Sequence, residues 1–180
     1  MTRFALWLGG AALAPLAMVL LVVVPPGVLG DEDKGTLKPD EVGPEAKQIL
    51  GADICATVAQ AETVTVYKVA PGRMDDPEIG IPGYFVERKK ELDPAEALKA
   101  KRALLDGAAL ISRLDRPPAT PAPYEFVLRF RHGTEVATAA VGFGDEGTKE
   151  GRLHFIEGGR DVAVRRGALS ELLASTFPKP

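Results

Sequence analysis

Hydrophobic residues follow two different patterns along this chain. Residues 4–24 form an uncharged run of 21 residues, whereas short apolar stretches alternate with charged ones in the remainder. Residues 1–30 hold 21 of the hydrophobic residues, and about 41% of the following 150 residues are hydrophobic, a share typical of a soluble globular domain. The pattern predicts an amino-terminal apolar segment (1–30) followed by a single globular domain.

The apolar run is flanked by charges of opposite sign. Arg3 precedes it, and three acidic residues follow at 31–33, which predicts an amino terminus inside and a domain outside the membrane. A signal peptide cut after Gly30 and a retained anchor, about 31 Å long as a helix, both fit. On either interpretation we expect the domain to be extracytoplasmic, because it is cleaved and exported or anchored N-in/C-out.

The positions of Gly, Pro and apolar residues divide the next part of the chain into a tether, helices and strands. Residues 31–43 are charged and interrupted by Gly and Pro, which predicts a flexible tether. From Pro44 the spacing of apolar residues predicts a helix to about residue 61. Strands are expected at 63–69 and 84–92, with an irregular loop at 70–83 between them. A helix over 94–106 follows the capping residues Asp93 and Glu96, and we expect a short helical continuation over 110–114.

The carboxyl-terminal third predicts two β-hairpins and a helix. Turns at His132-Gly133 and Gly158-Gly159 separate stretches whose apolar residues alternate with polar ones. The expected elements are strands at 124–131, 134–143, 152–157 and 160–165 and a helix at 168–176. The domain (44–180) is therefore expected to have an α+β fold, with an antiparallel sheet of about six strands packed by about three helices.

Composition narrows the possible functions. The formal charge is −3, and the part after residue 30 is more acidic, which argues against a nucleic-acid partner. Cys55 is the only cysteine, and only His132 and His154 provide imidazoles, so no disulfide scaffold or zinc site is expected. None of the serines lies in a Gly-x-Ser-x-Gly motif, and we expect neither a catalytic residue nor a metal or cofactor.

Alternation along the last strands suggests one local basic surface. If the apolar residues of these strands point into the core, five basic side chains share the opposite face: Arg129, Arg131, Arg152, His154 and Arg165. Arginine forks match carboxylates, phosphates and acidic glycans, so this face is a candidate anion-binding surface. The alternative is a solvated face on which these arginines pair with Glu125, Glu135 and Asp161.

Part of the chain resembles a group of uncharacterised exported bacterial α+β proteins. The resemblance covers about residues 61–142 and rests on the segments AETVTVYKV, GYFV and ALLDG. The later hairpin of that group usually contains cysteines, whereas YEFVLRFRHG and EVATAAVGFG here contain none. The resemblance implies an α+β fold and no particular activity.

The sequence favours a non-catalytic binding or interaction domain of the cell envelope, with an anionic ligand or an envelope protein as partner. Two alternatives stay open. One is a small extracytoplasmic hydrolase that uses carboxylates or Cys55, and the other is a protease-inhibitor-like module that presents the 70–83 loop.

Overall fold

The computed structural model describes residues 35–72, 76–113, 123–144 and 149–178. The predicted signal peptide or anchor (1–30) and the start of the predicted tether lie outside the described residues. Within the described residues, no helix is long and apolar enough to cross a membrane.

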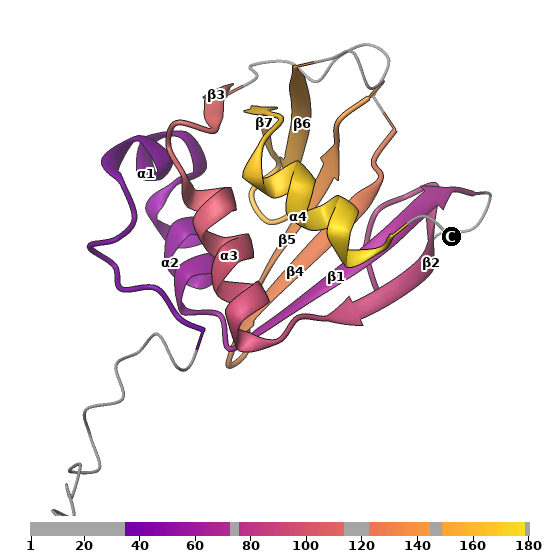
Figure 1. Cartoon of the computed structure of the whole chain (residues 1–180), viewed down its shortest axis with the longest axis horizontal. Helices are drawn as coiled ribbons and strands as arrows, with labels where there is room; N and C mark the ends of the chain where they lie inside the picture. The colour runs from indigo at the N-terminus through magenta and orange to yellow at the C-terminus, as the bar shows by residue number, and fades with distance from the viewer. Residues whose placement is uncertain (1–34, 73–75, 114–122, 145–148, 179–180) are drawn as a thin grey trace, which may run out of the picture.

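Seven antiparallel strands form one twisted sheet with the order β2-β1-β4-β5-β6-β7-β3 (Figure 1). The hairpin β1–β2 lies at one edge of the sheet, with β2 outermost. After β3 at the opposite edge, the chain crosses back so that β4 pairs with β1. From β4 to β7 each strand pairs with the next. The strands are β1 (Thr63–Pro71), β2 (Tyr84–Glu91), β3 (Leu110–Arg113), β4 (Phe126–His132), β5 (Glu135–Gly142), β6 (Glu150–Phe155) and β7 (Arg160–Arg165).

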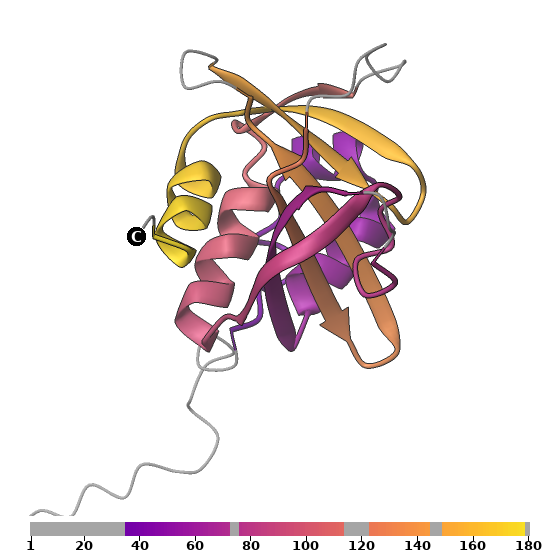
Figure 2. The ribbon, with the colours of Figure 1, turned by 90° about the vertical axis from the view of Figure 1, so that its right-hand side faces the viewer.

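Four helices cover one face of this sheet, as Figures 1 and 2 show from two sides: α1 (Pro44–Leu50), α2 (Ala52–Gln60), α3 (Pro94–Leu105) and α4 (Ala168–Thr176). Their apolar residues form one core with alternate strand residues such as Val66, Leu128, Phe130 and Phe155. The predicted α+β class is therefore confirmed. The predicted capping box of α3 is also present, because Asp93 accepts a hydrogen bond from the Glu96 amide and Glu96 bonds back to Asp93.

Four local predictions differ from the structure. The single helix expected over 44–61 is two helices that meet at Gly51, where a φ of 91° interrupts the α conformation. Residues 110–113 form edge strand β3 and not a helical continuation, because they pair with β7. The first hairpin turns at Gly133-Thr134, one residue later than expected, and residues 156–159 form a longer turn in the second hairpin. Both shifts move the pairing by an even number of residues, so each side chain keeps its expected face.

Residues 35–43 pack against the domain, which differs from the tether expected over 31–43. Leu37 and Val42 are buried in the core, and the Leu37 amide donates to the carbonyl of Ala59. The fully buried Lys101 of α3 donates from Nζ to the carbonyls of Gly35 and Ala61. Burial lowers the Lys101 pKa to about 8, since these dipoles replace only part of the hydration of an ammonium group.

Candidate functional site

The face of the sheet opposite the four helices, called the helix-free face below, holds all five basic residues of the predicted surface. On β4, Leu128 and Phe130 point into the helix-covered core, so Arg129 and Arg131 lie on the opposite side. The same alternation on β6 and β7 places the others there: Arg152, His154 and Arg165. They share a face but not one site, because β5 separates β4 from β6.

A segment of the predicted 70–83 loop crosses the helix-free face. Ile79 and Ile81 of this segment, residues 76–83 and called the strap below, are buried in a second apolar cluster with Tyr67, Val127 and Ala140. The small side chain of Ala140 on β5 leaves room for this close approach. The strap therefore lies flat on the sheet, with its two isoleucines directed inward.

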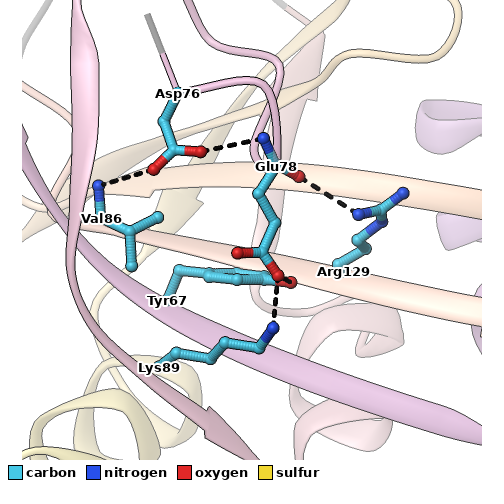
Figure 3. A network of polar contacts seen from close by, with 6 residues as sticks. All are labelled: Tyr67, Asp76, Glu78, Val86, Lys89 and Arg129. Carbon is cyan, nitrogen blue, oxygen red and sulfur yellow. Dashed lines mark hydrogen bonds and ion pairs between the residues drawn. The ribbon is translucent and has the colours of Figure 1, made fainter.

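Asp76 fixes the conformation of the strap, as Figure 3 shows. Its carboxylate accepts from the amide of Glu78 at 2.9 Å and from the amide of Val86 on β2 at 3.4 Å. Its carbonyl accepts from the amides of Ile79 and Gly80. An aspartate that bonds to the backbone two residues further on is a common turn-former, and here it also joins the turn to the edge strand.

Glu78 connects the strap to three strands. Its carboxylate accepts from the Tyr67 hydroxyl at 3.1 Å and from Lys89 Nζ, and its carbonyl accepts from Arg129 Nη1 at 3.2 Å (Figure 3). The hydrogen bond from Lys89 lowers the pKa of Glu78, and the same contact raises the pKa of Lys89. Burial, and then the hydrogen bond to Glu78, raise the pKa of Tyr67.

Beside this contact lies a polar hollow of about 170 Å³, called the basic hollow below. Strand pairing builds its floor, since Thr63 lies opposite Arg131 and Thr65 lies opposite both Arg129 and Glu91. Three side chains around it are cationic and two are anionic, so it has a net positive charge within an acidic domain. Its lining residues are Thr63, Thr65, Tyr67, Glu78, Lys89, Glu91, Arg129 and Arg131.

The cations of the basic hollow differ in their pairing. Lys89 forms an ion pair with Glu78. No ion pair joins Arg129 or Arg131 to a carboxylate among the described residues, and the buried Nε of Arg129 has no hydrogen-bond partner there. Two neighbouring guanidinium groups therefore face a hollow with hydrogen-bonding capacity unused.

On the other side of β5, the buried arginine has a carboxylate partner, although its Nη1 makes no hydrogen bond among the described residues. Arg152 is buried and bonds to Asp161, with Nε at 2.8 Å and Nη2 at 2.5 Å from Oδ1. His154 Nδ1 lies 3.2 Å from the same oxygen. Tyr124 packs against both basic residues, with its ring 6.3 Å from the imidazole and 5.5 Å from the guanidinium carbon. Arg152 and His154 thus belong to a packed cluster and do not extend the basic hollow.

The alternative of paired arginines holds for one residue of the set. Arg152 pairs with Asp161, as that alternative expects. Among the described contacts, Glu125 and Glu135 form no ion pair with an arginine, and Glu135 instead accepts from the Thr57 hydroxyl at 3.3 Å. Arg165 is exposed and lies opposite Glu150, away from β4.

Cys55 is buried on α2, inside the helix-covered core, and burial raises its pKa to about 11. A thiol with that pKa is a poor nucleophile at neutral pH. His154 is on the other face of the sheet, and His132 Nδ1 lies 3.8 Å from Glu62. Within the part of the chain that the structure describes, no group of His, Cys, Asp and Glu side chains is arranged to hold a metal ion.

A larger hollow, of about 680 Å³, lies between α3 and α4, but its lining has no net charge. Ala103, Ala168 and Leu172 contribute apolar surface, and the charged residues Lys99 and Glu171 are exposed at its rim. With Arg102 and Asp106, the charged residues of its lining balance in sign, whereas those of the basic hollow leave an excess of positive charge. The basic hollow is therefore the better candidate site.

Residues of the basic hollow from β1, β2 and the strap are absent from the sequence-based surface. Alternation in 63–69 already separates Thr63, Thr65 and Tyr67 from the apolar Val64 and Val66. What the sequence lacks is a sign that β1 pairs with β4, because these strands are separated by β2, α3 and β3. Glu78 and Lys89 depend on that same pairing for their place in the site.

Comparison with known proteins adds no relative: no protein-family model, curated protein or solved structure matches this chain.

Proposed function

We propose that this chain is an exported or membrane-anchored cell-envelope protein whose domain is a non-catalytic binding module for an anionic ligand. The observation that carries the proposal is the pair Arg129 and Arg131, which face a hollow without a carboxylate partner among the described residues. Guanidinium groups bind carboxylates and phosphates through paired, charge-assisted hydrogen bonds. The uncharged run at 4–24, with its flanking charges, supports a location outside the cytoplasm.

Binding is tested by thermal stability of the full chain in a nonionic detergent, in acetate, phosphate or glutamate, each compared with sodium chloride at equal ionic strength. A ligand that binds only the folded state raises the unfolding temperature. We expect at least one anion to raise it for the natural chain and for Arg165→Gln, and not for the double variant Arg129→Gln/Arg131→Gln. Equal responses in the natural chain and the double variant would contradict the proposal.

Location has its own test, with a carboxyl-terminal tag and an alkaline wash of isolated membranes. A cleaved signal peptide predicts a shortened chain in the soluble extracytoplasmic fraction, and an anchor predicts a full-length chain that resists the wash. A full-length chain in the cytoplasm would overturn export in either form.

A further inference from the structure

Besides the two arginines, the basic hollow presents two hydroxyl groups and a carboxylate, and a simple anion cannot bind to the carboxylate. Thr63 and Thr65 contribute hydroxyl groups from β1, and Glu91 contributes a carboxylate from β2. A carboxylate accepts hydrogen bonds and repels negative charge. Glu91 lies on β2 opposite Thr65 of β1. Its carboxylate therefore favours a ligand that has, besides its anionic group, a neutral part that donates hydrogen bonds.

The charge of the basic hollow sets the charge of the ligand. Glu78 forms an ion pair with Lys89, and the negative charge of Glu91 offsets the positive charge of one of the two arginines in the count. The net charge of the lining side chains is one positive, which a monoanion balances and a dianion exceeds. Glu91 repels the second charge of a dianion, so the balance favours a monoanion over dianionic phosphate and sulfate.

Size gives a third constraint. The basic hollow has a volume of about 170 Å³, equivalent to roughly six water molecules at about 30 Å³ each. It is smaller than the pockets of about 300–1,000 Å³ that enclose drug-sized ligands. The part of the ligand that enters is thus one small ring or a short hydroxylated chain.

From these three constraints we infer that the basic hollow binds a hydroxylated monocarboxylate, such as a sugar acid, with its carboxylate on Arg129 and Arg131 and its hydroxyl groups on Thr65 and Glu91. This inference rests on the proposed function and specifies its ligand. The register supports the arrangement, because Arg129, Thr65 and Glu91 lie side by side on three adjacent strands. A ligand across these strands meets cation, hydroxyl and carboxylate in that order.

Isothermal titration of the full chain in nonionic detergent tests this arrangement with four probes of matched concentration. Galacturonate contains both features, acetate has only the carboxylate, galactose has only the hydroxyl groups, and inorganic phosphate is the multivalent anion. We expect galacturonate to bind at least tenfold more tightly than each of the others. A trimer of galacturonate distinguishes the source, since tighter binding of the trimer than of the monomer indicates a polymeric acid and equal binding a free one.

Variants assign the contacts. Arg131→Gln is expected to weaken galacturonate binding more than tenfold, because a charge-assisted hydrogen bond contributes about 1.5–3 kcal/mol. Thr65→Val, which keeps the side-chain shape, is expected to weaken it about fivefold. Glu91→Gln is expected to improve phosphate binding, because it removes the repelling charge. Arg165→Gln, an exposed arginine on the same face, is the control and leaves all affinities unchanged.

The outcomes separate this inference from the proposed function. Acetate or phosphate binding as tightly as galacturonate, with loss in Arg131→Gln, would overturn the hydroxylated ligand and leave an anion-binding domain. Galactose binding as tightly as galacturonate would overturn the role of the carboxylate. No binding by any probe, or binding that Arg131→Gln does not alter, would overturn both.

Discussion

The two faces of the sheet use the same strands for different purposes. Toward the helices, the strands present Leu128, Phe130, Phe155 and similar residues, all fully buried in a continuous core. Toward the other side they present threonines, arginines and a histidine, with a smaller apolar cluster under the strap. On β4, the core residues Leu128 and Phe130 therefore alternate with Arg129 and Arg131, which are available for binding on the other side.

Charge is handled differently on the two faces. Among the described residues of the helix-covered layer, Lys101 is a fully buried cation, and it donates hydrogen bonds to two carbonyls. The helix-free face buries Arg152 against Asp161 and keeps Arg129 and Arg131 beside a hollow. The buried cations Lys101 and Arg152 thus have partners within the fold, whereas the two arginines of β4 have no carboxylate partner among the described residues.

The largest difference between the faces is expected for two successive residues of β4. Phe130→Ala should lower the free energy of unfolding by about 3–5 kcal/mol, because it leaves a cavity in the helix-covered core. Arg131→Ala, on the opposite face and exposed, should change it by less than about 0.5 kcal/mol. Chemical denaturation measures both, and similar losses would show that the two faces contribute equally to stability.

A smaller loss is expected from the packed cluster of the helix-free face. Asp161→Asn leaves the buried Arg152 without its counter-charge and should lower the free energy of unfolding by about 2–3 kcal/mol. The double variant Arg152→Met/Asp161→Leu is the control, and we expect it to lose less because no unpaired charge is left. Urea denaturation measures the free energy of unfolding of each variant. If Asp161→Asn does not lower it, this ion pair contributes as little to stability as an exposed one.

The smallest effect concerns Lys101 and pH. Its pKa in the folded state is about 8 against an ordinary 10.5, so between these values the unfolded chain binds more protons and the free energy of unfolding rises with pH. From pH 8 to 9 the rise should be about 1 kcal/mol. The raised pKa of Cys55 acts in the opposite direction mainly above pH 9, so in this window it offsets only part of the rise.

Denaturation of Lys101→Met at the same two pH values provides the comparison. The variant cannot titrate at this position, so the rise should be absent from it. An equal rise in both proteins would assign the pH dependence to another group and contradict the lowered pKa of Lys101.

The sequence predicts which face each strand residue occupies much better than it predicts which strands are neighbours. Alternation assigned Arg129, Arg131, Arg152, His154 and Arg165 to one face, and shifts of hairpin turns by an even register left that assignment intact. Local signals such as the capping box at Asp93 also agree with the structure. These features depend on spacing within a few residues, which a single sequence displays directly.

Long-range pairing accounts for most of what the sequence did not predict. Residues 110–113 have apolar residues that fit a helical turn or a strand, and only their pairing with β7 decides between these. The basic hollow needs β1 beside β4 and Glu78 on the strap above them, and no local pattern encodes that arrangement. The sequence does not indicate the burial of Lys101 either, because a lysine on a helix is usually exposed.

The most direct test of ligand binding on the helix-free face is a nuclear magnetic resonance titration of the full chain with galacturonate in nonionic detergent. We expect progressive shifts of the backbone amide signals of Thr63, Thr65, Glu91, Arg129 and Arg131, while those of α3 and α4 stay in place. Shifts confined to the α3–α4 hollow, or no shift at saturating galacturonate, would contradict it.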